Sequence, residues 1–186
     1  KWLKLGADGW RLDVADLGCG SGCIAIALAK HLPQSEVFAF DISDEAIAQT
    51  EENAAHNSVN VKVRKADMRK GLPEKVSFDI IVSNPPYVRE SEKIEMKPNV
   101  TEYEPYTALF VKDDNPLEFY RSIASIAECH LKEMGTIYLE TNEALCHETE
   151  LIFTSLNYEI KTVKDFFGKD RMVFARKKPY CGLSTN

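Results

Sequence analysis

The run Ser83-Asn84-Pro85-Pro86-Tyr87 holds the residues of this sequence best suited to bind a planar –NH2 group. It follows an apolar stretch at residues 78–82 that predicts a buried parallel strand, and open α/β sheets bind ligands at the carboxyl ends of such strands. Each proline fixes its φ angle and lacks an N–H, so the turn is stiff and its carbonyls can accept hydrogen bonds. The side-chain oxygen of Asn84 and the carbonyl of Pro85 would suit an amide or the exocyclic amine of a base. Taken alone, the run also fits an ordinary proline-rich turn.

A glycine-rich loop upstream favours a binding site over an ordinary turn at residues 83–87. The loop Gly18-Cys19-Gly20-Ser21-Gly22 follows the first predicted strand, and glycines let a backbone turn sharply and approach a ligand closely. Asp41 ends the second predicted strand, where a carboxylate can accept both hydroxyls of a ribose. A dinucleotide fingerprint would need its third glycine at position 23, which is cysteine, so the pattern disfavours NAD. With Asp16 before it, the loop instead resembles motif I of class I S-adenosylmethionine methyltransferases.

The elements that would position these residues alternate between strands and helices. Ser43 is predicted to cap the second helix, and Asn115 or Asp114 to cap the third, which would close at Gly135. Such alternation predicts one three-layer α/β domain with a largely parallel sheet. The segment at residues 88–114 is predicted to be a long polar loop, a kind that is usually functional or mobile. Strands are expected at residues 12–17, 36–41, 59–66, 78–83, 136–140, 158–163 and 171–176, and helices at 23–31, 44–57, 116–134 and 143–156.

Further segments, taken with these motifs, resemble the HemK/PrmC family, which methylates the side-chain nitrogen of a glutamine in peptide-chain release factors. The sequence at residues 81–88 is similar to the signature of that family. The resemblance extends over about residues 15–175. It implies a class I S-adenosylmethionine-dependent methyltransferase fold, which is Rossmann-like, with seven mostly parallel strands, an antiparallel last strand and helices on both faces. Later similar segments are Tyr103-Glu104-Pro105, Ala108-Leu109-Phe110, Phe119-Tyr120 and residues 164–171.

The same resemblance implies roles for single residues. Asn84 and Pro85 would hold the acceptor glutamine, with Pro86 and Tyr87 completing the catalytic site. Hydrogen bonds to both amide N–H groups would localise the nitrogen lone pair and aim it at the methyl group, so that positioning governs the displacement. For Glu102, Glu104 and Glu140, surface or structural roles fit at least as well. The residues implied to bind S-adenosylmethionine are Asp16, Gly18, Cys19, Gly20, Ser21, Gly22, Asp41 (ribose), Ile42, Asp67 and Met68 (adenine), and Asn84; Met68 stands where relatives often have an aromatic residue.

Composition narrows the classes of partner. The 186 residues carry a net charge of −6, which gives no broad basic surface for nucleic acid. The sequence has neither an apolar run of membrane-spanning length nor a signal peptide. The five cysteines include no Cys-x-x-Cys pair, and the four histidines lack ligand spacing with them, so no metal is expected. We expect a cytoplasmic protein whose partner is a release factor, without direct contact to nucleic acid or membrane.

The predicted catalytic domain covers residues 12–177, between an atypical extension at 1–11 and a flexible tail at 178–186. We expect the residues of this extension to be too few to form the N-terminal helical domain that the resemblance implies. Two alternatives remain: a nucleic-acid amino-methyltransferase of the adenine N6 type, and a domain that binds the cofactor as a non-catalytic partner. Residues 5–15 also resemble the glycosidase strand that carries a nucleophilic aspartate, here Asp13, but the necessary second carboxylate and larger barrel are not evident.

Overall fold

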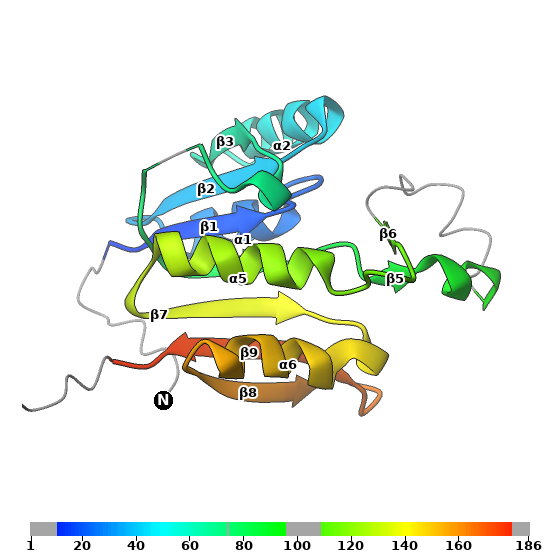
Figure 1. Ribbon diagram of the computed structural model, residues 1–186. Helices are drawn as coiled ribbons and strands as arrows, with labels where there is room; N and C mark the ends of the chain where they lie inside the picture. The colour runs from blue at the N-terminus through cyan, green and yellow to red at the C-terminus, as the bar shows by residue number, and fades with distance from the viewer. Residues whose placement is uncertain (1–10, 74, 96–108, 180–186) are drawn as a thin grey trace, which may run out of the picture.

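Seven strands form one sheet in the computed structural model, which describes residues 11–73, 75–95 and 109–179 (Figure 1). Their order is β3-β2-β1-β4-β7-β9-β8, and β9 alone runs antiparallel to the other six strands of this sheet. The predicted fold class, including the antiparallel last strand, is therefore confirmed. The strands are β1 (Asp13–Leu17), β2 (Glu36–Asp41), β3 (Lys62–Lys65), β4 (Phe78–Ser83), β7 (Leu131–Glu140), β8 (Tyr158–Lys164) and β9 (Asp170–Lys177).

Helices cover both faces of the sheet because its central strands are apolar on both sides. In β1, Val14 lies in the cluster with α1 (Cys23–His31), whereas Ala15 and Leu17 lie in the cluster with the helices of the other face. The helix α2 (Asp44–His56) packs beside α1. On the opposite face lie α5 (Glu118–His130) and α6 (Cys146–Ser155), which stand in front of the sheet in Figure 1.

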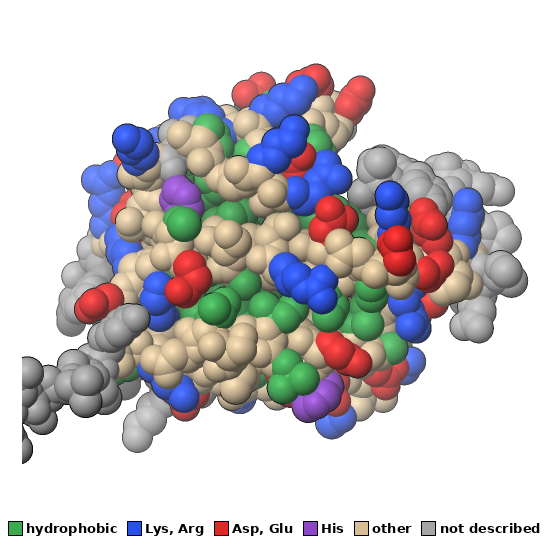
Figure 2. Space-filling view, viewed as in Figure 1, with side chains coloured by type: hydrophobic (Ala, Val, Ile, Leu, Met, Phe, Trp, Pro, Cys, Tyr) green, Lys and Arg blue, Asp and Glu red, His purple; other side chains and the backbone are tan. Residues whose placement is uncertain are grey.

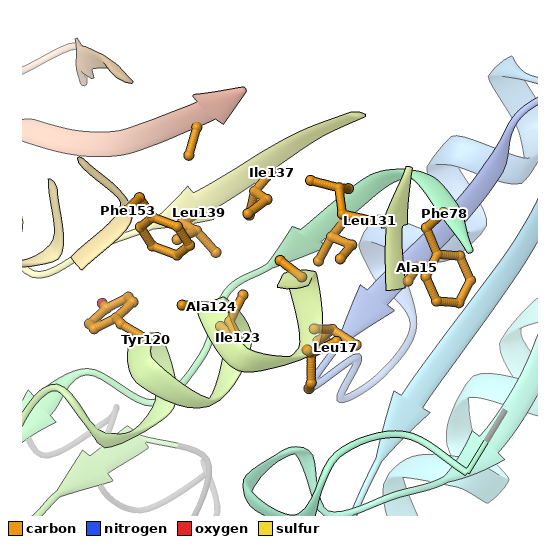
Figure 3. Close-up of a cluster of buried hydrophobic side chains, with 14 of the residues drawn as sticks. Ala15, Leu17, Phe78, Tyr120, Ile123, Ala124, Leu131, Ile137, Leu139 and Phe153 are labelled. Carbon is orange, nitrogen blue, oxygen red and sulfur yellow. The ribbon is translucent and has the colours of Figure 1, made fainter. Parts of the chain in front are cut away.

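The larger core cluster fixes α5 against the middle of the sheet (Figure 3). Tyr120 and Ile123 of α5 are fully buried, as are Leu17 of β1, Ile137 of β7 and Phe153 of α6. Burying side chains of this size contributes about 1.5–3 kcal/mol each. The core thereby fixes the relative positions of β1, β4 and β7; the glycine loop follows β1 and the Asn-Pro-Pro-Tyr run follows β4.

The third predicted helix is shorter than expected. The sequence predicted residues 116–134, but α5 ends at His130 and Leu131 already pairs with Phe78 as part of β7. Leu131 and Met134 continue a helical apolar spacing, yet Leu131 is the C-cap and already has an extended backbone, with a φ of −89° and a ψ of 127°. The predicted caps are also wrong, because Leu117 occupies the N-cap position and Asn115 Oδ1 accepts a hydrogen bond from Arg121 instead.

Other predicted elements differ less. Ser43 caps α2 as expected, since its hydroxyl accepts a hydrogen bond from Ala46 N. The third strand shrinks to Lys62–Lys65, which pairs with residues 38–41 of β2. The helix predicted at 143–156 divides into the 3-10 turn Glu143–Leu145 and α6. The predicted loop at 88–114 contains the short parallel pair β5 (Val88–Arg89) and β6 (Phe110–Val111), together with the 3-10 helix η2 (Glu90–Glu95).

Several predictions fall on residues that the structure does not describe. These are the extension at 1–11 except Arg11, the tail at 178–186 except its first two residues, Glu102, the segment Tyr103-Glu104-Pro105, and Ala108.

The amino ends of the strands carry a separate polar cluster. Lys132 Nζ lies 2.8 Å from Asp13 Oδ2 and 2.8 Å from Asp79 Oδ2, so it joins β1, β4 and β7. Asp13 is therefore part of an ion-pair cluster, at the edge opposite Asn84. A cavity of about 480 Å3 also opens at this edge, where β2 and β3 begin, and its lining includes Lys30, Glu36 and Lys62. It lies away from both predicted motifs.

Candidate functional site

The carboxyl ends of four strands bring the predicted motifs into one row. Leu17 of β1 pairs with Phe40 of β2 and with Ser83 of β4, and Ser83 pairs with Leu139 of β7. The next residue on each strand or in the loop after it is Gly18, Asp41, Asn84 or Glu140, respectively. The glycine loop and the Asn-Pro-Pro-Tyr run thus lie side by side at the point where the chain diverges toward opposite halves of the sheet, a usual ligand position in open α/β sheets.

The glycine loop turns sharply against the end of β2. Gly18, Gly20 and Gly22 have φ values of 73°, 54° and 80°, in the region that favours glycine. The N–H groups of Gly18 and Cys19 donate to the carbonyl of Phe40 at 2.8 and 3.0 Å. A side chain at Gly22 would have its Cβ 2.7 Å from Thr50 Cγ2, so this position lacks room for one.

Two residues of α2, which the sequence analysis missed, hold the loop from outside. Thr50 Oγ1 donates to the carbonyl of Gly20 at 2.9 Å, and Asn53 Nδ2 donates to the carbonyl of Ser21 at 2.9 Å. Cys19 is buried, with its Sγ 3.5 Å from Thr50 Oγ1. Thr50 and Asn53 are three positions apart on one helix, so both side chains lie on the same face, but the local sequence does not show that this face meets the glycine loop.

Asp41 lies against the loop. Its Oδ2 accepts a hydrogen bond from Gly20 N at 2.9 Å, and its Oδ1 accepts one from Ser43 N at 3.0 Å. A carboxylate oxygen can accept more than one hydrogen bond, so acceptor capacity remains for two hydroxyls. Beside it, Ile42 exposes 49% of its surface.

Asp16 is a buried carboxyl with an unused oxygen. It is 1% exposed, and its Oδ2 accepts from Ala25 N at 3.0 Å, while its Oδ1 has no hydrogen-bond partner among the described residues. Burial raises the pKa of Asp16 to about 7; the hydrogen bond from Ala25 opposes this shift, and the nearby charge of Asp41 adds to it. An oxygen of this kind is a site for a cationic or hydrogen-bond-donating ligand group.

Replacing Asp16 with asparagine is expected to stabilise the unliganded protein at pH 8 but not near pH 4. Because the folded-state pKa of about 7 lies above the ordinary aspartate pKa of 3.8, Asp16 in the folded wild type keeps a proton that it loses in the unfolded chain. Wild-type stability therefore falls as pH rises from about 4 to 7, by about 4 kcal/mol from this group. Urea unfolding of both proteins at several pH values measures the difference. If the difference in unfolding free energy between the variant and wild type did not change with pH, the prediction would be wrong.

The two residues predicted to flank adenine, Asp67 and Met68, have different surroundings. Met68, in the 3-10 turn η1 (Met68–Lys70), lies against the loop, because its methyl carbon is 3.1 Å from where a Cβ on Gly18 would be. The Asp67 carboxylate instead accepts hydrogen bonds from Arg69 Nε at 2.8 Å and from Arg69 Nη2 at 3.0 Å. The hydrogen bonds from Arg69 keep the pKa of Asp67 below its usual value.

The Asn-Pro-Pro-Tyr run begins at a fixed point. Ser83 Oγ donates to the carbonyl of Leu17 at 2.6 Å inside the sheet. Asn84 is exposed and its side chain makes no hydrogen bond to another described residue, whereas Pro85 is buried and Pro86 is half-buried. The Asn84 amide oxygen is therefore available to accept a hydrogen bond from a ligand.

Tyr87 closes the run with a neutral hydroxyl. Its Oη donates to Glu140 Oε1 at 2.8 Å, so the structure brings Glu140 to the site. Burial, together with the hydrogen bond to Glu140, raises the pKa of Tyr87 to about 12. Within residues 11–73, 75–95 and 109–179, no group of three His, Cys, Asp or Glu side chains could hold a metal ion. No helix in those ranges is long and apolar enough to cross a membrane.

The family model of the methyltransferase small domain matches residues 5–102, just over half of the chain. The chain belongs to this family. The match includes the glycine loop, Asp41 and the Asn-Pro-Pro-Tyr run.

Two curated relatives are named release factor glutamine methyltransferase. The protein from Flavobacterium psychrophilum is 46% identical over 87% of this chain and 57% of its own length. That from Bacteroides thetaiotaomicron is 44% identical over 87% of this chain and 59% of its own length. The chain thus spans somewhat over half the length of these relatives.

Solved structures support the methyltransferase fold. A ribosomal protein L11 methylase from Lactobacillus delbrueckii subsp. bulgaricus superposes with a TM-score of 0.64 at 24% identity, over 93% of this chain and 73% of that one. A methyltransferase from Pyrococcus furiosus has a TM-score of 0.67 at 21% identity, over 91% of this chain and 76% of that one. At these identities the similarity concerns the fold.

Proposed function

We propose that this chain is the catalytic domain of an S-adenosylmethionine-dependent enzyme that methylates the side-chain amide of the glutamine in the Gly-Gly-Gln motif of peptide-chain release factors. The observation that carries the proposal is the row of Gly18, Asp41 and Asn84 across three register-paired strands. In the proposed enzyme, this row would put the glycine loop that binds the cofactor beside two hydrogen-bond acceptors for an –NH2 group. The names of the two curated relatives support the substrate class.

The residues of the loop region fit S-adenosylmethionine. The unused Oδ1 of Asp16 and the remaining acceptor capacity of Asp41 match an ammonium group and ribose hydroxyls. Ile42 and Met68 offer apolar surface for adenine. When bound, the cofactor would supply an electrophilic methyl group on a sulfonium. We expect no metal in this reaction, because displacement from a sulfonium needs none.

The Asn-Pro-Pro-Tyr run would prepare the acceptor amide. Asn84 Oδ1 and the carbonyl of Pro85 each accept one N–H of the glutamine side chain, which fixes the nitrogen and draws its lone pair away from the amide carbonyl. Prolines 85 and 86 have no N–H that could compete for these acceptors. The neutral ring of Tyr87 forms a wall of the pocket. Once the N–CH3 bond has formed and the S–CH3 bond has broken, the nitrogen is acidic enough to release one proton to water, so positioning rather than a strong base would account for the rate.

Surface charge favours a protein over a nucleic acid as the partner. Figure 2 shows acidic and basic side chains interspersed on the face that carries α5 and α6, without a continuous basic area for phosphates. Base methylation would also require the target base to leave its stack. A partner in translation supports a cytoplasmic location.

The test is transfer of labelled methyl from S-adenosylmethionine to a purified release factor, with DNA and RNA as parallel acceptors. A release factor whose Gly-Gly-Gln glutamine is replaced by alanine is the control. Label that appears on the release factor and disappears in this control supports the proposal. Label on nucleic acid alone supports the adenine-type alternative. No label on any acceptor, with S-adenosylhomocysteine binding shown by calorimetry, supports the non-catalytic partner domain.

A further inference from the structure

We propose that Glu140 and Asn142, at the carboxyl end of β7, are positioning residues that orient the acceptor-binding run at residues 84–87. The inference rests on the proposed function, because it concerns how the same amide-binding site is held. Neither residue needs to touch the substrate for this role. Both would act through Tyr87.

Tyr87 is held at both ends by these two residues. Its hydroxyl donates to Glu140 Oε1 at 2.8 Å, and its backbone carbonyl accepts from Asn142 Nδ2 at 3.2 Å. The two prolines before it have fixed φ angles, so few torsions separate Tyr87 from Asn84. A rotation at Tyr87 is therefore transmitted to the acceptor oxygens of Asn84 and Pro85.

Asn142 uses its whole side chain in this contact region. Its second Nδ2 hydrogen bond goes to Glu92 Oε2 at 3.0 Å, and its Oδ1 accepts from Ala144 N at 3.0 Å. Glu92 in turn accepts from Arg89 N at 2.9 Å and from Arg89 Nη2 at 2.8 Å. Asn142 thus connects β7, η2 and the acceptor-binding run, and alanine could replace none of these bonds.

The backbone under both residues is itself fixed. Tyr120 is fully buried and its hydroxyl donates to the carbonyl of Glu140 at 3.3 Å. Thr141 lies between the two residues, is fully buried, and its N–H donates to the carbonyl of Arg171 in β9 at 2.8 Å. Glu140 and Asn142 are consequently anchored to α5 and β9, and can act as fixed points for Tyr87.

The run has few other attachments. At its start Ser83 bonds to Leu17, and beyond Tyr87 the short strand β5 pairs with β6. Losing the Glu140 or Asn142 contact would release the middle of the segment, and misplacement of a reacting group by about 1 Å can cost about a hundredfold in rate. We expect the loss to appear in kcat, because the cofactor loop makes none of these contacts.

The experiment compares Glu140→Ala, Glu140→Gln, Asn142→Ala and Tyr87→Phe. Glu133→Gln is the matched control, since it changes an exposed acid on the same strand near the opposite edge. Glu140→Ala, Asn142→Ala and Tyr87→Phe are expected to lower kcat for release-factor methylation about tenfold to a hundredfold. KM and the Kd of S-adenosylhomocysteine should stay within about threefold of wild type. Glu140→Gln keeps an oxygen that can accept from Tyr87 and should stay within about fivefold in kcat.

A double-mutant cycle separates positioning from general damage. The Tyr87→Phe/Glu140→Ala double variant should be no slower than the slower single variant, because both remove one contact. Amide hydrogen exchange at Asn84 and Tyr87 should become at least about tenfold faster in Glu140→Ala and Asn142→Ala, and stay unchanged in Glu133→Gln. Thermal melts identify any variant that fails to fold; Tyr87→Phe and Glu140→Gln conserve volume and keep the comparison decisive.

The outcomes separate this inference from the proposed function. Wild-type label on the release factor, combined with unchanged kcat in Glu140→Ala and Asn142→Ala or with additive effects in the cycle, overturns the inference alone. Absence of wild-type label on the release factor overturns the proposed function. In that case the exchange rates still decide whether Glu140 and Asn142 hold the run, and unchanged rates count against it.

Discussion

Replacing Asn84 with alanine is expected to lower the rate of methyl transfer by about a thousandfold and to change the Kd of S-adenosylhomocysteine by less than about threefold. The Asn84 side chain is exposed and has no hydrogen-bond partner among the described residues, so its removal leaves the fold intact. Acceptors and donors aimed at the reacting group typically contribute about 10²–10³-fold to a rate. Single-turnover assays give the rate, and calorimetry gives the Kd.

Asn60→Ala is the matched control for this variant, because Asn60 is an exposed asparagine beside the cavity at the opposite edge of the sheet. It should behave as wild type in both measurements. Asn84→Asp retains side-chain acceptor oxygens and should lose less activity than Asn84→Ala. If Asn84→Ala lost cofactor affinity in parallel with its rate, the proposed division between an acceptor site and a cofactor loop would be wrong.

The second large effect is expected from Gly22→Ala, which should lower the free energy of unfolding by about 2–5 kcal/mol and weaken cofactor binding. Gly22 has a φ of 80°, a backbone conformation that costs an alanine about 1–2 kcal/mol. The new Cβ would also lie 2.7 Å from Thr50 Cγ2 and 2.9 Å from Thr50 Oγ1, and such overpacking costs about 1–3 kcal/mol more. Thr50 must then move, which disturbs its hydrogen bond to Gly20 in the glycine loop.

Gly168→Ala measures the cost of the backbone conformation alone. Gly168 also has a φ of 80°, but nothing lies within 4 Å of the added Cβ. Its expected loss is only about 1–2 kcal/mol, with no change in cofactor affinity. In the Gly22→Ala background, Thr50→Ser removes the clashing methyl group, keeps the hydroxyl, and should restore part of the stability. Urea unfolding gives the free energy of unfolding of wild type and of the three variants Gly22→Ala, Gly168→Ala and Gly22→Ala/Thr50→Ser. Equal losses for Gly22→Ala and Gly168→Ala would rule out the contact with Thr50 as the cause.

Most of the strands and helices could be predicted because their signals are local. Short apolar runs bounded by Gly, Pro and Asp mark β1, β2 and β4, and each predicted motif directly follows such a run. The end of α5 could not be predicted, because an apolar spacing at Leu131 and Met134 continues the helical pattern. Pairing of Leu131 with Phe78 outweighs that local preference.

The supporting residues of the site lacked a local signal. Tyr87 and Glu140 are separated by 53 positions, and the parallel pairing of β4 with β7, in which Ser83 lies opposite Leu139, brings them together. Thr50 and Asn53 likewise reach the glycine loop across about 30 positions. The cap predicted for Asn115 failed for a related reason, since Arg121 one turn and a half later takes its side-chain oxygen.

The insertion of β9 between β7 and β8 has a consequence for the order of folding during synthesis. β8 has no hydrogen-bonded neighbour in the sheet except β9, and β7 has β4 on its other side only. Until residues 170–177 have left the ribosome, β7 therefore exposes an open edge and β8 has nothing to pair with. The non-local pairing must form late, which slows folding and favours capture of the nascent chain by chaperones. Because Thr141 N–H donates to the carbonyl of Arg171, the proposed amide-binding site would also be completed at this late step.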